Sequence, residues 1–237
     1  MLKQKKLGKG VVYYSDLIPE LEHFFTTRLT NVDEYADDIC EYLKIDKINL
    51  IHPEQTHSSN VEFVKEGQQN YPDTDSLILT NSTQAIYLRF ADCTPVILYD
   101  KKSNIGAIAH AGWRGTASKI VPKTVSKMLE YSKTEEKDIY AIIGPAIGSC
   151  CYEVGKDVVE KISLTIKDKK NIIISRQKAD FIDLKRANAQ QLIEYGIPKE
   201  NIDICPFCTS CNNNEFFSYR KESGTIQRHN AVIKLKS

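Results

Sequence analysis

A cysteine and a histidine stand at the borders of apolar runs in this sequence, where side chains that line sites are often placed. Cys93 lies between the runs AIYLRF and PVILYD, and Asp92 and Pro95 interrupt the apolar pattern on either side of it. His110 lies near the end of the run IGAIAHAG, which closes with Gly112, a residue that lets the backbone approach a ligand closely. The pair predicts a site, although a buried thiol and a packed imidazole are the alternative interpretation.

His57 is the third candidate for this site. It follows the polar turn PEQT and opens the extended segment HSSNVEFV, where it would share a face with Val61 and Phe63. Two imidazoles and a thiolate from three segments suit zinc, which in catalytic sites often keeps a fourth position for water. The same trio also suits a Cys–His nucleophile pair with an assisting imidazole. Spacing alone does not choose between these chemistries.

A second group of cysteines offers another metal hypothesis. The stretch CPFCTSC has Cys205, Cys208 and Cys211 at C-x-x-C-x-x-C spacing, with His229 as a distant fourth ligand. Structural zinc sites of the ribbon type usually show two separated C-x-x-C pairs, whereas this stretch is one extended cluster. We therefore favour the trio of His57, Cys93 and His110 as the metal site.

The elements that must position these residues alternate between strands and helices. Apolar residues at helical spacing, with Asn31 and Glu34 spaced as a capping box, predict a helix over 31–43. Further helices are expected after Gly115, over 153–162 and over 183–197. The remaining apolar runs predict strands over 48–52, 57–64, 85–90, 95–100, 105–112, 139–144, 201–205 and 230–235.

The connections between these elements indicate the fold class. Polar residues 100–104 form a turn of hairpin size between two strands, which argues against a purely parallel sheet. No linker, repeat or low-complexity tract divides the chain. We expect a single α/β domain over residues 1–237 with a mixed sheet and flanking helices.

Composition limits the partners of the protein. A formal net charge of +1 gives no reason to expect nucleic acid or an anionic membrane as the main partner. No apolar run approaches the ~18 residues of a transmembrane helix, and the basic start lacks the apolar region of a signal peptide. Seven cysteines without an export signal indicate reduced thiols in the cytoplasm. A monomer is compatible with all of these observations.

Six stretches resemble, in order, the YfiH-like laccase-domain family: QTHSSNV, DTDSLI, ADCTPVILYD, AHAGWRGT, IGPAIGSCCYEVG and CTSCNNNEFFSYRKESGTIQR. The resemblance runs from Phe24 to the C-terminus, and members are also called polyphenol oxidoreductases and purine nucleoside phosphorylases. It implies a single-domain sandwich related to cysteine-hydrolase-like folds, with His57, Cys93 and His110 as the metal-binding and catalytic trio. It also implies phosphorolysis of adenosine, inosine and methylthioadenosine, deamination of adenosine or, by an older assignment, copper-dependent oxidation of phenols.

Phosphorolysis needs cations or backbone N–H groups to hold phosphate. Three arginines lie in motifs that match the family and are the expected phosphate or substrate ligands: Arg28, Arg114 and Arg220. The turn over 144–148, which holds two glycines and a proline, could donate N–H groups to an anion. Trp113 could stack on a purine or anchor the core.

Deamination makes different demands. Zinc lowers the pKa of bound water to ~7 for attack on the purine ring, and a proton shuttle is needed. No H-x-E signature is present, so Asp92, beside Cys93, or Glu54 would serve, with Asp92 preferred. Copper could replace zinc in the trio, but five histidines are too few for a multicopper centre. An oxidoreductase acting on phenols and a metal-binding protein with little catalysis remain the alternatives.

Two departures from the family pattern concern loops near the expected site. Arg28 is followed by Leu29, Thr30 and Asn31 where the family usually has a pair of glycines, and the tail reads TIQRHNA, with Arg228 in the usual arginine position. The trio itself is intact.

Overall fold

Two six-stranded sheets lie face to face in the structure, a computed structural model that describes residues 2–236. Met1 and Ser237, the ends of the expected domain, lie outside the described residues. Across the first sheet the order is β1 (Leu2–Leu7), β2 (Gly10–Ser15), β3 (Leu21–Phe25), β15 (His229–Leu235), β7 (Ala85–Phe90) and β4 (Leu50–Ile51). Strand β15 pairs antiparallel with β3 on one side and β7 on the other, and the short β4 joins β7 in parallel.

The second sheet is mixed and contains the predicted hairpin. Its order is β14 (Ile202–Ile204), β10 (Ile139–Ile143), β8 (Thr94–Asp100), β9 (Ile105–Ala111), β6 (Ser76–Leu79) and β5 (Val61–Phe63). Strands β8 and β9 pair antiparallel along their whole length. Asp100 closes the turn by accepting the backbone N–H groups of Lys102 and Ser103 at 3.0 and 3.1 Å. The prediction of a hairpin at 100–104 is therefore confirmed.

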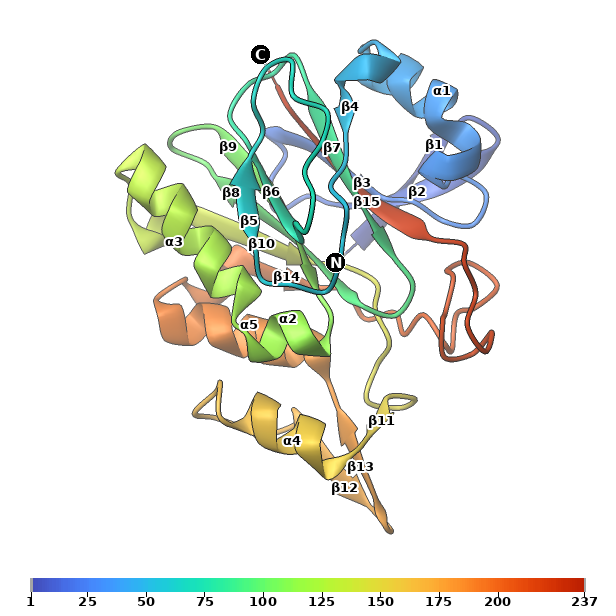
Figure 1. Cartoon of the computed structure of the whole chain (residues 1–237), viewed down its shortest axis with the longest axis vertical. Coiled ribbons are helices and arrows are strands. Elements are labelled where there is room, and N and C mark those ends of the chain that lie inside the picture. Colours follow the sequence, from blue (N-terminus) through green and yellow to red (C-terminus); the bar gives the residue numbers. More distant parts are fainter. Residues whose placement is uncertain (1, 237) are drawn as a thin grey trace.

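The main core fills the space between the two sheets, because alternate side chains of each strand point inward. Ile86, Leu88 and Phe90 of β7 belong to the same buried cluster as Ile97 and Ile108 of the second sheet. The outer face of the first sheet is covered by α1 (Val32–Leu43), and that of the second by α3 (Ile120–Ser132) and α5 (Leu184–Tyr195). Figure 1 shows these helices flanking the sheets. The expectation of a mixed α/β fold is confirmed.

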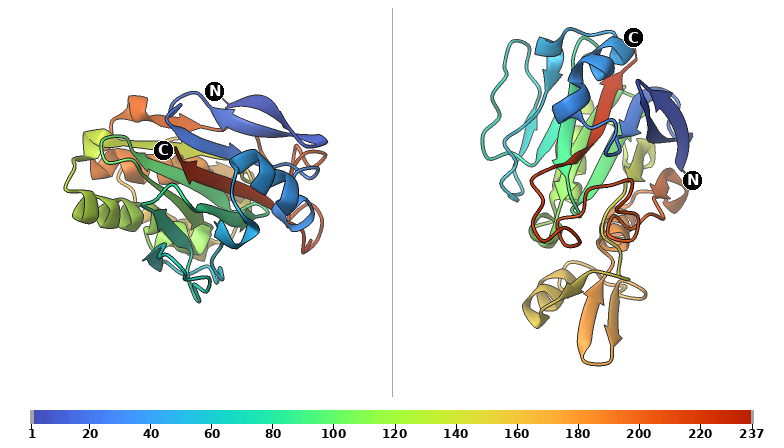
Figure 2. Two further views of the ribbon diagram at one scale, coloured as in Figure 1. Left: turned by 90° about the horizontal axis from the view of Figure 1, so that it is seen from above. Right: turned by 90° about the vertical axis from the view of Figure 1, so that its right-hand side faces the viewer.

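A small third sheet projects from one end of the molecule (Figures 1 and 2). It consists of β11 (Glu153–Val154), β13 (Ala179–Ile182) and β12 (Ile173–Arg176), and α4 (Lys156–Ser163) packs against it. The short α2 (Trp113–Ala117) connects this unit to the second sheet, since Trp113 packs against the apolar cluster of α4. Single 3-10 turns lie at Lys47–Asn49, Glu136–Asp138 and Lys199–Asn201.

Local signals explain the element boundaries. Asn31 caps α1 by accepting the backbone N–H of Glu34 at 3.1 Å, and Gly196 ends α5 with a φ of 118°. The expected strand over 57–64 is wrong in its first half, because the strand covers only Val61–Phe63 and His57 has a φ of 62° in the preceding loop. Within residues 2–236, none of the helices has the length and apolar character needed to span a bilayer.

Candidate active site

Cys93 lies on the short link by which the chain passes from the first sheet to the second. The link joins β7 to β8, and Asp92 within it has a φ of 81°, in the left-handed region that few side chains adopt. The Asp92 carboxylate accepts the Thr209 hydroxyl at 2.6 Å and the Arg220 backbone N–H at 2.7 Å. Asp92 was the preferred proton shuttle, but both of its carboxylate oxygens accept hydrogen bonds from the loop after β14. Asp92 therefore positions this loop.

The structure brings the predicted trio together from three elements. His110 is on β9 opposite Pro95, and His57 comes from the loop between β4 and β5. Ligand atoms of His57, Cys93 and His110 lie within 4.8 Å of one another. The two imidazoles meet edge to face, with ring centroids 4.9 Å apart. A Cβ at Gly112 would lie 2.8 Å from the Cys93 sulfur, so a larger residue at this position would displace the thiol or the loop.

Asp75 fixes the geometry of the trio, and the sequence analysis did not find it. Its fully buried carboxylate accepts the His110 Nδ1–H at 2.7 Å and the backbone N–H groups of His57 and Ser58 at 3.1 and 2.7 Å. His110 therefore presents Nε2 to the site, and the His57 loop is held in its left-handed turn. The sequence feature that could have indicated Asp75 is its position directly before the apolar run SLIL.

These contacts set the charges of the site. Burial opposes ionisation of Asp75, but hydrogen bonds and the charge of His110 lower its pKa to about 2. Burial also disfavours the Cys93 thiolate, yet the charge and hydrogen bonds of His110 and a hydrogen bond of His57 lower the pKa of Cys93 to about 6. Against the effect of burial, the Cys93 charge and the Asp75 hydrogen bond raise the pKa of His110. The site favours a thiolate beside an imidazolium.

The donor set fits a zinc or copper ion. Two imidazoles and one thiolate converge, and a carboxylate behind His110 orients its ring, as is usual for metal-binding histidines. His57 is exposed, so a fourth position would face solvent. The same arrangement also fits a thiolate nucleophile paired with an imidazole.

A cleft of about 780 Å³ opens over the trio. It contains four arginines, of which Arg114 and Arg220 were predicted, while Arg89 and Arg228 were not assigned to the site. Aromatic side chains complete it, with the Arg220 guanidinium 5.4 Å from the centre of the Tyr152 ring. The lining consists of His52, Pro53, Glu54, Gln55, His57, Arg89, Ala91, Asp92, Cys93, His110, Arg114, Tyr152, Tyr219, Arg220, Ile226 and Arg228.

The structure does not bring every predicted ligand to the cleft. Arg28 is absent from the lining of the cleft. Its guanidinium donates to the Asn213 carbonyl at 2.7 Å and forms an ion pair with Glu222 at 2.5 Å. The same guanidinium lies 4.3 Å from the centre of the Phe217 ring. Trp113 anchors the small third sheet and is also outside the lining. The 144–148 turn likewise supplies none of the lining residues.

Glu54 is the other candidate proton shuttle, and its position differs from that of Asp92. Its exposed side chain lines the cleft, while its backbone is fixed to Tyr71 and Thr74 by hydrogen bonds of 2.9 and 3.1 Å. Glu54 thus offers a carboxylate to the cleft, whereas Asp92 uses both oxygens internally.

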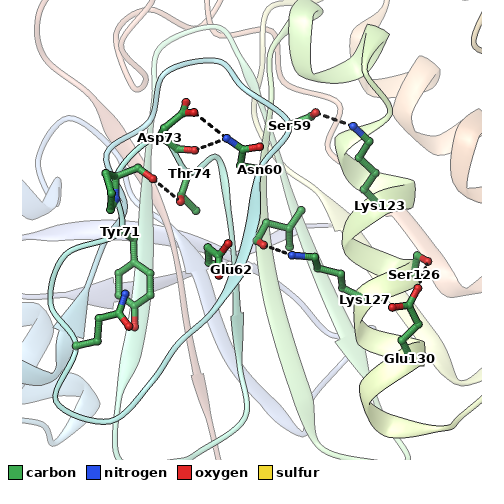
Figure 3. Close-up of a pocket in the computed structure, with 13 residues that line it drawn as sticks. Ser59, Asn60, Glu62, Tyr71, Asp73, Thr74, Lys123, Ser126, Lys127 and Glu130 are labelled. Atoms are coloured by element: carbon green, nitrogen blue, oxygen red, sulfur yellow. Dashed lines mark hydrogen bonds between the residues drawn. The ribbon is translucent and has the colours of Figure 1, made fainter.

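A second hollow, of about 650 Å³, lies between α3 and the loops around β5 (Figure 3). Its polar groups bond to one another, as Lys123 does to Ser59 at 2.7 Å and Asn60 to Asp73 at 2.9 Å. Lys127 donates to the Val61 carbonyl. The hollow contains neither histidine nor cysteine, so the chemistry predicted from the sequence has no counterpart there.

The metal ligands proposed in the C-terminal part are only partly brought together. Cys208 and Cys211 lie close to each other, but Cys205 and His229 are not in their group. His229 is buried between the rings of Phe90 and Phe216, and burial lowers its pKa to about 3. The ligand set Cys205, Cys208, Cys211 and His229 is therefore wrong.

The structure thus combines a two-sheet sandwich with a His–Cys–His trio that is supported by a buried carboxylate. The chain belongs to the family described as "Multi-copper polyphenol oxidoreductase laccase", which matches residues 25–236. It is 34% identical over 236 residues to "Purine nucleoside phosphorylase SACOL1200" of Staphylococcus aureus (strain COL), covering 95% of this chain and 88% of that protein. A "Purine nucleoside phosphorylase" of Bacteroides thetaiotaomicron is 30% identical over 241 residues, covering 87% and 89%.

Solved structures show the same fold. The crystal structure of the Bacillus licheniformis hypothetical protein YfiH superimposes with a TM-score of 0.89 at 29% identity, covering 95% of this chain and 96% of that one. YlmD from Geobacillus stearothermophilus gives a TM-score of 0.88 at 25% identity and 99% coverage of both chains.

Proposed function

We propose that this protein is a purine nucleoside phosphorylase that cleaves adenosine, inosine and methylthioadenosine with phosphate and also deaminates adenosine. The observation that carries the proposal is a single cleft that holds the His57–Cys93–His110 trio and four arginines together. The names of the curated relatives support the phosphorolysis of purine nucleosides.

In phosphorolysis, a phosphate oxygen forms a bond to C1′ of the ribose while the bond from C1′ to the purine nitrogen breaks. Arg114 and Arg220 line the cleft and are the proposed ligands of the phosphate anion. Arg114 stacks on Trp113 at 4.4 Å, which limits the freedom of its guanidinium. Tyr152 and Tyr219 offer aromatic surface for the purine. The leaving base takes up a proton, for which Glu54 is the proposed source.

In deamination, a water oxygen replaces the amino group at C6 of adenosine, and the amine leaves as ammonia. A zinc ion held by His57, Cys93 and His110 would supply Lewis acidity for this reaction. Asp75 keeps His110 Nε2 directed into the site, and Glu54 is the proposed carrier of the proton from water to the leaving amine. Copper could occupy the same ligands.

Oxidation of phenols, named in the family description, finds less support. Among the histidines outside the trio, His52 lines the cleft, whereas His23 and His229 are buried with their pKa values lowered to about 4 and about 3 by burial. The imidazoles of His23 and His229 are buried in the core, so the chain has too few histidines for a multicopper centre.

The test is incubation of the purified protein with inosine and phosphate, followed by chromatography for hypoxanthine. Adenosine without phosphate reports deamination as inosine, and metal content is measured on the same sample. Hypoxanthine formation that depends on phosphate and is lost in His110→Ala supports the proposal, with Cys205→Ala as control outside the cleft. Oxygen consumption with a phenol, and no hypoxanthine, would overturn it.

A further inference from the structure

Four cysteines outside the cleft form a cluster that the proposed function does not use. Cys150 and Cys151 belong to the turn after β10, and Cys208 and Cys211 form a C-x-x-C pair after β14. Their four sulfur atoms lie within 4.8 Å of one another, although about 60 residues separate the two pairs in sequence. All four are free thiols in the structure.

The sulfur spacing has the dimensions of a tetrahedral metal site. Cys211 Sγ lies 3.6 Å from Cys150 Sγ and 3.4 Å from Cys151 Sγ. A tetrahedron of sulfurs about 2.3 Å from a central zinc has edges of about 3.8 Å. A disulfide would need about 2.05 Å. Small adjustments of the cysteine rotamers therefore suffice to bind a metal at the centre.

The backbone around the cluster is built for close approach of the two segments. The Gly148 N–H donates to Cys208 Sγ at 3.2 Å, and a Cβ at Gly148 would lie 3.2 Å from Cys150 Sγ. Residues 146 and 208 form a parallel bridge, and the Thr209 N–H donates to the Ala146 carbonyl at 3.1 Å. The two cysteine pairs are thus fixed together by backbone contacts as well as by their sulfurs.

We propose that Cys150, Cys151, Cys208 and Cys211 bind a second metal, a zinc ion in an all-sulfur site. Four soft thiolates at tetrahedral spacing are the donor set of structural zinc sites. Cys208 is buried, whereas Cys150 and Cys211 are exposed, so an ion can enter from solvent.

A zinc ion at this site would stabilise the segments that carry Tyr152 and Thr209 beside the cleft. Cys151 directly precedes Tyr152, which lines the cleft, and Thr209 between the other two ligands bonds to Asp92 beside Cys93. The Arg220 guanidinium donates to the Glu153 carbonyl at 3.2 Å, so the chain that follows each cysteine pair is joined here as well. The site does not depend on the reaction proposed above, since its ligands are separate from the trio.

Zinc stoichiometry tests this site directly. Protein reduced under anaerobic conditions is loaded with zinc, freed of unbound metal and analysed for zinc per chain. The double variant Cys150→Ser/Cys211→Ser should bind one zinc fewer than the wild type, while Cys205→Ala, from the same cysteine-rich stretch but outside the cluster, should match the wild type. His57→Ala, which removes a ligand of the trio, should leave the zinc of the cluster in place.

Thiol labelling of the wild-type protein keeps the test decisive if the double variant fails to fold. Zinc should slow alkylation of the exposed Cys150 and Cys211 at least tenfold, read by mass spectrometry, and leave the buried Cys40 and Cys205 unchanged. Equal zinc content in the wild type and the double variant would overturn the proposal. Equal labelling with and without zinc, or a disulfide among these cysteines that takes up no zinc after reduction, would do the same.

Discussion

Replacing Asp75 by asparagine tests whether one buried carboxylate organises the active site. One of its oxygens accepts His110 Nδ1–H and the His57 N–H, and the other accepts the backbone N–H groups of Thr56 and Ser58. Asparagine must turn an NH₂ group toward one of these pairs of donors. About two charge-assisted hydrogen bonds are lost, each contributing about 1.5–3 kcal/mol, so the cost before relaxation is about 3–6 kcal/mol.

The effect on activity follows from the orientation of His110. Removing a carboxylate behind a functional imidazole typically lowers activity or metal affinity about 10–100-fold. For Asp75→Asn we expect kcat/KM for inosine phosphorolysis to fall by this factor, equivalent to about 1.4–2.8 kcal/mol. Hypoxanthine formation measures the rate, and urea unfolding measures the stability. Asp73→Asn is the matched control, because Asp73 is an exposed carboxylate on the same turn that bonds to Asn60 and not to His110.

The pH dependence of stability gives a second comparison between the wild type and Asp75→Asn. The pKa of Asp75 is lowered from 3.8 to about 2 in the folded state, so its ionisation stabilises the fold by roughly 2 kcal/mol above about pH 5. This contribution is lost as the pH falls through the folded pKa. The stability difference between wild type and Asp75→Asn should therefore shrink from pH 5 to pH 2. Wild-type turnover, zinc content and unfolding midpoint in Asp75→Asn would refute the reasoning.

Four further substitutions separate phosphate binding, chemistry and packing. Arg114→Ala should raise the KM for phosphate about tenfold or more, whereas Arg28→Ala should leave that KM unchanged and lower the urea midpoint, because Arg28 bonds to Glu222 and Asn213. A shift of the phosphate KM in Arg28→Ala alone would reverse this assignment. Cys93→Ala should abolish adenosine deamination with the circular dichroism of the fold retained; intact deamination would make Cys93 a structural thiol. Gly112→Ala puts a methyl group 2.8 Å from the Cys93 sulfur, so both activities should fall together, and unchanged rates would show that the site tolerates this displacement.

Regular elements could be predicted from the sequence because their signals are local. The apolar runs and their lengths identified the strands β7, β8 and β9, and capping by Asn31 located the start of α1. Since β8 and β9 are buried on both faces, they appear as continuous apolar runs. These strands carry or adjoin Cys93 and His110, which is why those two residues were recognisable.

The partners of the site residues were not predictable, because they depend on pairing between distant segments. Asp75 bonds to His110, which lies 35 positions further along the chain. Arg28 bonds to Glu222, 194 positions away, and not to groups of the cleft. The left-handed turn at His57 also broke the expected strand, since its backbone N–H bonds to Asp75. Spacing in one sequence carries no information on such contacts.

The position of β15 has a consequence for how the protein is made. This strand, residues 229–235, inserts between β3 and β7, which precede it by more than a hundred residues. During translation, the first sheet therefore remains split into two halves until residue 235 has left the ribosome. The facing edges of β3 and β7 stay open for pairing with other chains throughout this period. A ribosome stalled before residue 229 would thus expose an aggregation-prone nascent chain.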